Sequence, residues 1–419
     1  MDFVHFIYDC IIILITVYTV RHYAFTLNRL YGRQRHPFVD IDTANWPTVT
    51  VLVAAHNEEA VISHSMEALV SVNYPPEKIK VVVVNDRSDD TTGEIIESYV
   101  KRYPERISHF NRTEGKPGKA SALKDATESV ISDIIIVFDA DYIPGRGLIK
   151  QLVSPFFDPE VGLVMGRVVP LNTGGNLLTR LLDMERAGGY QVDQQARMNM
   201  GLLPQYGGTV GGVRMTTLRD VGGWLDNTLA EDTDLTYRAL LRGWKTVYQN
   251  RSECYEEVPE TWAVRIRQII RWAKGHNQSL RRYTGDVLKS KNVRFAERVD
   301  ALLLLGVYAM SPVILAGWVI GIYLFYCGEM RVFGGYMPLL ALISYSAVGN
   351  SAAFFEIAAA VYLDGGRRRL RLLPFNFFNF MISTLSVTRG IITYAAAKPA
   401  GREKWEKTQR FREQTFVVM

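Results

Sequence analysis

Two short segments in the second half of the chain carry side chains suited to group-transfer chemistry. The first, residues 228–235, holds the three carboxylates Glu231, Asp232 and Asp234 within four positions. A carboxylate can accept the proton of a hydroxyl group as that hydroxyl attacks a substrate. An acidic cluster that opens a helix also serves as an N-terminal cap and dipole complement, and this alternative remains open from the residues alone.

The second segment places Gln268, Arg271 and Trp272 on neighbouring turns of a predicted helix. Arg can hold an anionic leaving group, and Trp offers a flat apolar ring for stacking. An isolated Arg-Trp pair is most often a surface contact. Here two further acidic segments lie upstream and a long apolar segment lies downstream. This combination of segments in one chain favours a functional site.

Three apolar segments in the first third of the chain predict the strands that position this chemistry. Residues 48–55, 80–84 and 134–138 are almost continuously apolar, and helical segments separate them. This alternation predicts an α/β fold with a parallel sheet covered on both faces. In open sheets of this kind, ligands bind at the carboxyl ends of the strands. We therefore expect the site at that edge.

Polar residues follow each predicted strand directly. They are His56 and Glu58 after the first strand, Asp86 after the second, and Asp139 and Asp141 after the third. Converging carboxylates repel one another unless a cation or a cationic ligand joins them. Mg²⁺ and Mn²⁺ both accept oxygen ligands of this kind, so a divalent ion that bridges a diphosphate is the predicted occupant.

Two glycine-rich segments are candidates for close contact with a ligand. Residues 115–120 are either a plain turn or a loop that brings Lys119 to a phosphate at the start of the next helix. Their spacing is not that of a nucleoside-triphosphatase loop. Residues 206–212, which include Gly208, allow close backbone approach to a ligand, with a tight turn as the alternative.

Composition narrows the class of protein. The chain has 419 residues, 48% of them hydrophobic, and its formal net charge is +5. The basic residues gather beside apolar segments at the two ends, which indicates membrane-flanking charge and argues against a nucleic-acid partner. Three cysteines in no metal-binding spacing and only seven histidines disfavour disulfides and a histidine metal site.

The apolar ends predict a multi-pass membrane protein. Residues 3–20 are long enough to span and are followed by arginines, which places the next part of the chain in the cytoplasm. A signal peptide is the alternative, but the basic start and the small-residue cleavage site of such peptides are missing. Residues 301–327 and 336–363 are predicted spans, and the second contains Glu356, which we expect to be functional or partnered.

The remaining membrane segments are less regular. Residues 259–283 are amphipathic and basic, which favours a helix lying on the membrane surface. Residues 372–397 contain Asn376, Asn379 and Arg389, so they either span or lie at the interface. We favour the second, because it keeps the basic tail on the cytoplasmic side.

Taken together, these segments resemble the processive family-2 glycosyltransferases of membranes. That group includes the synthases of cellulose, hyaluronan, chitin oligosaccharide and poly-N-acetylglucosamine. The resemblance covers residues 46–300 and the surrounding membrane arrangement, and the final residues, 405–410, are similar to the tail of these synthases. It rests on residues 56–59, Asp86, residues 118–119, residues 139–141, residues 231–232 and residues 268–272.

The resemblance implies a GT-A fold, inversion at the anomeric carbon and a UDP-sugar donor, UDP-glucose or UDP-N-acetylglucosamine. It implies Asp232 as general base beside Glu231, Asp141 and Asp139 as metal ligands, and Trp272 and Gly208 as contacts of a polysaccharide acceptor. The nucleotide sugar would be held by Ala54, His56, Glu58, Asp86, Lys119, Asp139, Gln268 and Arg271.

The same resemblance divides the chain into five parts. They are a transmembrane helix (1–22), a cytoplasmic GT-A domain (46–258), interfacial helices (259–300), a membrane region (301–397) and a cytoplasmic tail (398–419). Cellular location is then the plasma membrane, with a lipid bilayer around the chain. The small number of spans implies a narrow channel, a homo-oligomer or an accessory export subunit.

One departure and one alternative accompany this interpretation. Many relatives have Thr before the Glu-Asp pair, where this chain has Ala230. The alternative function is a non-processive transferase that adds one sugar to a lipid carrier. A hydrolytic or purely structural membrane protein is a distant third, because it leaves the ordered acidic strand ends without a role.

Overall fold

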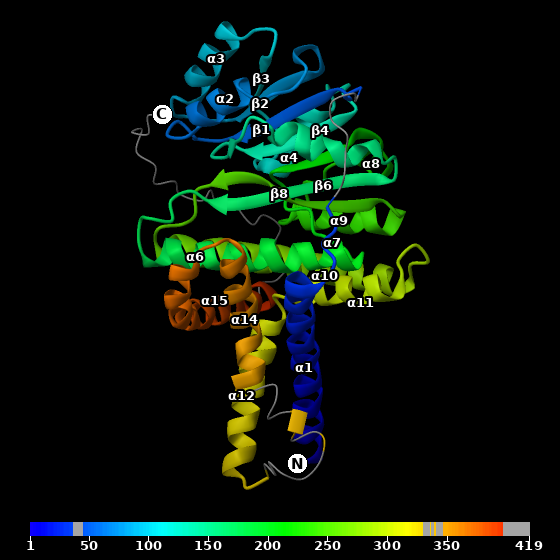
Figure 1. Ribbon diagram of the computed structural model, residues 1–419, viewed down its shortest axis with the longest axis vertical. Coiled ribbons are helices and arrows are strands. Elements are labelled where there is room, and N and C mark those ends of the chain that lie inside the picture. The colour runs from blue at the N-terminus through cyan, green and yellow to red at the C-terminus, as the bar shows by residue number, and fades with distance from the viewer. Residues whose placement is uncertain (37–44, 330–335, 337–338, 341–346, 397–419) are drawn as a thin grey trace.

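The computed structural model describes residues 1–36, 45–329, 336, 339–340 and 347–396. Figure 1 shows three levels along the long axis of the molecule. A twisted sheet with its covering helices lies at one end, a layer of long helices crosses beneath it, and a stem of helices that includes α1 extends to the other end. The N-terminus lies at the tip of the stem.

The sheet has eight strands in the order β3-β2-β1-β4-β7-β6-β8-β5. The strands are β1 (Val49–Ala55), β2 (Ile79–Asp86), β3 (Ile107–Arg112), β4 (Ile134–Asp139), β5 (Ile143–Pro144), β6 (Val161–Pro170), β7 (Gly211–Arg214) and β8 (Lys245–Glu256). The first half, β3 to β4, is parallel, as the apolar strands predict. The second half of the sheet is mixed, because β7 runs antiparallel to both β4 and β6.

Burial on both faces explains why the central strands read as unbroken apolar segments. Val51, Leu52 and Val53 of β1 are all fully buried, although neighbouring side chains point to opposite faces. One face packs with α2 (Ile62–Val70), and the other packs with α4 (Lys119–Thr127). The other helices beside the sheet are α3 (Thr92–Arg102), α5 (Leu148–Val153), α8 (Met215–Asp220) and α9 (Glu231–Arg242).

Two long helical segments form the layer beneath the sheet. The first comprises α6 (Leu177–Ala187), a π-helical segment η3 (Gly188–Gln194) and α7 (Gln195–Met200). The second is α10 (Trp262–Lys289), the predicted amphipathic helix, followed by α11 (Phe295–Gly306). A π-helical segment inside an α-helix is rare and is frequent at functional sites.

The stem contains the candidate membrane spans. Helix α1 (Asp2–Tyr31) is long and apolar enough to cross a membrane, and it continues nine positions past the predicted end at residue 22. The predicted span over residues 301–327 is found as a bent pair of helices. The segment bends by 75° between α11 and α12 (Met310–Tyr326), so α11 belongs to the layer beneath the sheet and α12 to the stem.

The C-terminal helices return to the layer beneath the sheet. Helix α14 (Ala347–Leu363) forms the later part of the predicted second span, and its Glu356 is partnered, as expected, by His22 of α1 at 2.5 Å. The segment η4 (Arg367–Phe375) and helix α15 (Asn376–Ala396) follow, and α15 packs along α10. Residues 367–395 are also long and apolar enough to span a membrane. The predicted tail, 398–419, lies outside the described residues.

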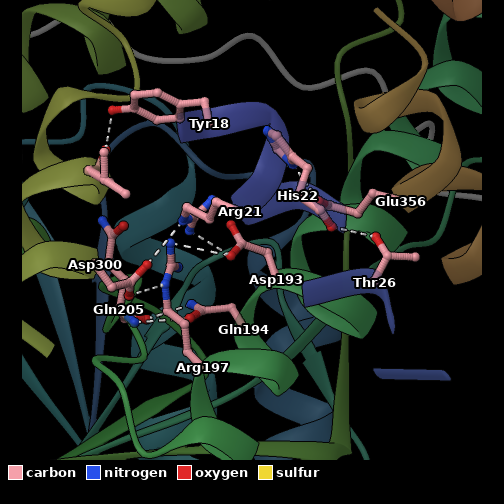
Figure 2. A network of polar contacts seen from close by, with 11 residues as sticks. Tyr18, Arg21, His22, Thr26, Asp193, Gln194, Arg197, Gln205, Asp300 and Glu356 are labelled. Carbon is pink, nitrogen blue, oxygen red and sulfur yellow. Dashed lines mark hydrogen bonds and ion pairs between the residues drawn. The ribbon is translucent and has the colours of Figure 1, made fainter. Parts of the chain in front are cut away.

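A buried ion-pair network joins the stem to the layer beneath the sheet. Arg21 of α1 contacts Asp193 of η3 and Asp300 of α11, each at 3.0 Å. Arg197 of α7 contacts the same two carboxylates, at 3.3 Å and 3.0 Å. Figure 2 shows the two arginines lying between the two aspartates. Positive and negative charge balance within the network, so neither aspartate is buried without a partner.

Replacement of Arg21 by Met is expected to destabilise the protein by about 3 kcal/mol, because it leaves two buried carboxylates sharing one arginine. The measurement is thermal unfolding of the purified protein in detergent. Arg33→Met is the matched control, because Arg33 is exposed and makes no ion pair with the described residues. Equal melting temperatures for the two variants would contradict a stabilising role for the network.

Candidate active site

A large cavity of about 2180 Å³ opens at the carboxyl ends of the parallel strands and runs along α10 to α15. Eleven of the thirteen residues predicted for the site line it: Ala54, His56, Glu58, Asp86, Lys119, Asp139, Glu231, Asp232, Gln268, Arg271 and Trp272. The other two, Asp141 and Gly208, lie directly behind its wall. Segments more than 200 positions apart in the sequence therefore contribute to one site.

The register of the parallel strands brings the predicted strand-end residues together. Ala54 of β1 lies beside Asp139 of β4 in the sheet. His56 Nδ1 donates to the backbone oxygen of Asp86 at 2.8 Å, which links the ends of β1 and β2. The chain leaves these two strands through Asn57 and Arg87, which have positive φ angles of 55° and 57°. Such strained positions cluster at functional sites.

Asp86 is neutralised by the protein itself. Its Oδ1 accepts from Arg112 Nη1 and from Arg87 Nη2, both at 2.8 Å, and its Oδ2 accepts from the backbone N–H of Gly118 at 3.0 Å. No motif in the sequence indicated these arginines as partners of Asp86. The expectation that a metal or a cationic ligand must offset Asp86 is therefore corrected, and Asp86 instead fixes the loop that leads into α4.

Lys119 supplies the charge that balances the next carboxylate. Its Nζ lies 2.5 Å from Asp139 Oδ1 and donates to the Gly208 backbone oxygen at 2.8 Å. Burial alone would lower the pKa of Lys119, but Asp139 and Glu231 outweigh that effect and raise it. A charged lysine is thus held at the start of a helix, where an anionic group also gains from the helix dipole.

Asp141 does not line the cavity. Only 1% of Asp141 is exposed, and its Oδ2 accepts from the backbone N–H of Glu257 at 3.5 Å. Among the described residues, no group of three His, Cys, Asp or Glu side chains is arranged to hold a metal ion. Mg²⁺ and Mn²⁺ are commonly held by one or two carboxylates together with substrate phosphates, and Asp139 on the cavity wall fits that donor set.

The acidic cluster divides into two functions. Helix α9 begins at Glu231, so all three carboxylates lie in its first turn, as predicted. Asp234 is 1% exposed and is held by Arg238 and Arg282, at 2.6 Å and 3.0 Å, and by the Tyr283 hydroxyl. It is a structural residue. Glu231 and Asp232 line the cavity instead.

Burial raises the pKa of both cavity carboxylates of α9. For Glu231 the neighbouring Asp232 adds to the effect, and for Asp232 the hydrogen bond from the Thr233 backbone N–H and the charge of Lys119 oppose it. A carboxylate with a raised pKa is a stronger proton acceptor. Gly208 allows the close approach of its loop, because a Cβ there would lie 3.1 Å from the Asp232 Cβ.

Helix α10 presents Gln268, Arg271 and Trp272 to the opposite side of the cavity. Gln268 Oε1 accepts from Arg265 at 3.0 Å, and Arg265 also pairs with Glu185 of α6 at 2.5 Å. No ion pair with a described residue engages Arg271, so its guanidinium is available to a ligand. All three residues lie on the cavity wall. The hydrogen bond between Gln268 and Arg265 also braces this part of the helix.

Two arginines hold the Trp272 ring. The guanidinium carbons of Arg186 and Arg265 lie 5.1 Å and 5.4 Å from the ring centroid, which is within cation–π range. Arg186 is itself anchored by Glu256, at 2.8 Å. The sequence reasoning missed Arg186 and Glu256. Only the abundance of Arg and Gln in residues 176–200 pointed to that helix.

Comparison with known proteins decides the class of chemistry. Residues 47–275, more than half of the chain, match the family described as Glycosyltransferase like family 2. The chain belongs to this family. A probable glycosyltransferase, YdaM, of Bacillus subtilis is 27% identical over 88% of both chains. Glucomannan 4-beta-mannosyltransferase 7 of Arabidopsis thaliana is 28% identical over 89% of this chain and 66% of its own length.

A solved structure shows the same fold. Mannosyltransferase PcManGT from Pyrobaculum calidifontis, solved with GDP-Man and Mn²⁺, superposes with a TM-score of 0.59 at 20% identity and covers 84% of this chain and 98% of its own. This family-2 glycosyltransferase therefore has a GT-A fold of the α/β, Rossmann-like type, with the mixed sheet described above. The predicted family and fold class are confirmed at this level.

Proposed function

We propose that this glycosyltransferase transfers a hexosyl group, with inversion, from a nucleoside-diphosphate sugar to a growing β-linked polysaccharide at a membrane. The observation that carries the proposal is the continuity of the cavity. One wall offers Lys119 and Asp139 at the strand ends, the middle offers Asp232 and Trp272, and the far end reaches α15. A donor, a base and an elongated acceptor can be held in one space.

The chemistry follows from these positions. Asp232 accepts the proton of the acceptor hydroxyl, which then attacks the anomeric carbon of the donor. The bond to the diphosphate breaks, and Arg271 stabilises the negative charge that develops on the leaving group. Inverting transfer needs the base and the leaving group on opposite sides of the sugar. Helix α9 carries the base on one side of the cavity, and α10 carries the arginine that stabilises the leaving group on the other side.

A divalent ion fits the donor end. Asp139 would hold Mg²⁺ or Mn²⁺ at the cavity wall, with Asp141 behind it as the second predicted ligand. The ion would supply charge stabilisation to the leaving diphosphate. Lys119 and Arg271 already bring positive charge to the same region.

The far end of the cavity supports a saccharide acceptor over a lipid carrier. Asn376, Asn379, Ser383 and Thr384 lie on one face of α15 and line the cavity. Asn379 donates to Glu185 Oε2 at 3.0 Å, which fixes its amide, and its buried Oδ1 then has no hydrogen-bond partner among the described residues. Sugar hydroxyls would satisfy such acceptors, whereas a lipid chain would leave them unpaired.

Donor identity is the finer part of the proposal. The sequence-based expectation is UDP-glucose or UDP-N-acetylglucosamine. The names of the plant relative and of the solved mannosyltransferase favour a mannosyl donor such as GDP-mannose. We therefore propose a hexosyl donor and include all three nucleotides in the test.

The membrane assignment is part of the same proposal. Within the part of the chain that the structure describes, two helices are long and apolar enough to span a membrane, or three if the bent pair α11 and α12 is one span. Figure 1 shows the catalytic end on one side of this stem. We propose a multi-pass protein of the plasma membrane with its catalytic domain in the cytoplasm, which moves the polymer outward alone, as a homo-oligomer or with an export subunit.

The deciding experiment uses the full chain in lipid vesicles with Mg²⁺ or Mn²⁺. Labelled GDP-mannose, UDP-glucose and UDP-N-acetylglucosamine are supplied separately, and the product is sized before and after glycosidase digestion. A long polymer from one donor supports processive synthesis and names the sugar. A lipid-linked product with one sugar would replace the proposal by the lipid-carrier alternative.

Trp272→Ala is expected to shorten the product severalfold while leaving the donor dissociation constant unchanged, because the ring is proposed to stack on the acceptor and not on the nucleotide. The measurements are product length and calorimetric titration with the donor. Trp244→Ala is the control, because Trp244 lies outside the cavity lining and bonds Asp220 at 2.9 Å. Unchanged polymer length in the Trp272 variant would contradict the stacking role.

A further inference from the structure

The side chain of Thr233 lies between the proposed base, Asp232, and Gln205, which directly precedes the glycine-rich segment 206–212. The Thr233 backbone N–H donates to Asp232 Oδ1 at 2.6 Å, and the Thr233 hydroxyl oxygen lies 3.3 Å from the same atom. Gln205 Nε2 donates to that hydroxyl oxygen at 2.9 Å. A hydroxyl has one proton to give. Because it accepts from Gln205, its own proton is directed to Asp232.

We propose that Gln205 is a positioning residue which acts through Thr233 to hold Asp232 Oδ1, so that Oδ2 faces the acceptor hydroxyl. The inference rests on the proposed function, in which Asp232 is the base. It assigns a role to two residues that touch neither the donor nor the acceptor in that proposal. The order of donation, Gln205 to Thr233 to Asp232, is its specific content.

His276 of α10 is a second polar neighbour of the Thr233 hydroxyl. Its Nε2 lies 3.4 Å from the Thr233 hydroxyl oxygen, and burial lowers the pKa of His276 to about 4, so the ring is neutral. Its Nδ1 has no hydrogen-bond partner among the described residues. A neutral ring that carries its proton on Nε2 donates to Thr233 as Gln205 does, and this again leaves the Thr233 proton for Asp232.

Gln205 is held in place by the π-helical segment. Gln194, the last residue of η3, donates through Nε2 to the Gln205 backbone oxygen at 2.8 Å and accepts from the Gln205 backbone N–H at 3.0 Å. Figure 2 shows this pair beside the Arg21 and Arg197 network. The next residue, Tyr206, donates to Thr236 of α9 at 3.2 Å. The loop is thus tied to both the layer helices and the first turns of α9.

This arrangement also explains how the site tolerates Ala230 at the position where many relatives have Thr. Ala230 has no hydroxyl, and its Cβ faces Gly275 of α10, where an added Cβ would lie only 2.7 Å away. The backbone of α10 therefore packs directly on this position. The hydroxyl beside the base comes instead from Thr233, the residue that follows the Glu-Asp pair.

Other charged and titratable groups face Asp232 from several elements. They are Glu231 on α9, Lys119 on α4, Asp139 on β4, Arg271 and His276 on α10, Tyr190 on η3, Tyr206 on the loop and Tyr308 after α11. All of them remain in the variants below. A change in the pH profile of those variants therefore reports the altered hydrogen bond.

The test compares transfer by Thr233→Val, Thr233→Ser and Gln205→Leu, with the donor accepted in the vesicle assay among GDP-mannose, UDP-glucose and UDP-N-acetylglucosamine. Thr233→Val is expected to lower kcat about tenfold, the size of one lost hydrogen bond, with an unchanged donor KM. The side-chain hydrogen bond of Thr233 lowers the pKa of Asp232, and it is the bond that Thr233→Val removes, because the backbone N–H remains. Its loss moves the acidic limb of the kcat profile to higher pH. Thr233→Ser is expected to retain activity and profile.

Two further variants test direction and specificity. The carboxylate introduced by Gln205→Glu accepts a hydrogen bond in place of donating one, so it turns the Thr233 proton away from Asp232. We therefore expect a larger loss of kcat than in Gln205→Leu. Thr217→Val is the matched control, since Thr217 is buried and its hydroxyl has no hydrogen-bond partner among the described residues. If Thr233→Val does not fold, the Gln205 variants carry the test alone.

The outcomes separate this inference from the proposed function. If Asp232→Asn retains transfer, the base assignment fails and the inference fails with it. If Asp232→Asn is inactive while Gln205→Glu and Thr233→Val keep the kcat and pH profile of the native protein, only the positioning role is overturned. A loss in all variants with no shift of the acidic limb would also overturn it, because a merely structural role predicts that pattern.

Discussion

Asp232→Asn is expected to lower sugar transfer by about 10³-fold, within the range that general acid–base catalysis contributes, while donor binding remains. The amide has nearly the shape of the carboxylate, but it cannot accept the acceptor proton. The carboxylate lies half-buried on the cavity wall at the start of α9, and desolvation by the surrounding protein raises its pKa. The measurements are kcat with saturating donor and calorimetric titration with the nucleotide.

The pH profile gives an independent check on the same residue. A base must be deprotonated, so activity is lost as the pH falls through the pKa of Asp232. Because burial raises that pKa, the acidic limb is expected above the ordinary range of an aspartate. Asp158→Asn is the control, because Asp158 is exposed and its contact is Lys245 at 3.4 Å. Equal activity of the two variants would remove Asp232 from the mechanism.

Lys119→Met is expected to weaken donor binding by on the order of 10²-fold, because one charge near a protein surface changes the interaction with a diphosphate by several kcal/mol. In the Lys119→Met variant, the carboxylates of Asp139, Glu231 and Asp232 would face the diphosphate with no adjacent lysine. The same change raises the pKa of Asp232 and Glu231, since Lys119 lowers both. The acidic limb of the activity profile is then expected at higher pH.

Two variants control for this substitution. Lys119→Arg keeps the charge and is expected to bind the donor far better than the Met variant. Lys124→Met removes a lysine from the same helix, where Lys124 is exposed and its partner, Asp226, lies 3.6 Å away. A donor affinity for Lys119→Met equal to that of Lys124→Met would show that the charge of Lys119 does not act on the nucleotide.

The expected metal contribution is tested by the same titrations with and without a chelator. Asp139 is held by Lys119 and also lines the cavity, so it can serve either a metal or the lysine alone. Donor affinity that falls on chelation in the native protein and not in Asp139→Asn would support Asp139 as a ligand. Unchanged affinity on chelation would leave Lys119 and Arg271 as the cations that face the diphosphate.

The sequence by itself predicted where the chemistry lies in the sheet. Apolar strands buried on both faces must be parallel neighbours, and their carboxyl ends must meet at one edge, so His56, Asp86 and Asp139 converge. The start of α9 at Glu231 was equally predictable, because carboxylates complement the positive end of a helix. These are local rules, and a single stretch of residues is enough to apply them.

Local rules did not separate the members of the acidic cluster. Asp232 and Asp234 have the same chemistry and are two positions apart, yet one lines the cavity and the other is enclosed by Arg238, Arg282 and Tyr283. Their side chains leave the helix in different directions. Which direction meets the cavity depends on how α9 packs against α10, and that packing is decided between distant segments.

The tertiary structure also decided the partners. Arg21 and Asp300 are 279 positions apart and meet at 3.0 Å, and Gln205 reaches Thr233 from a different segment. The tertiary structure likewise decided the bend between α11 and α12 and the antiparallel direction of β7. Composition alone would also permit a straight span and a parallel sheet. Periodicity fixes elements and faces, whereas charge pairing and packing between elements select among the arrangements that the periodicity allows.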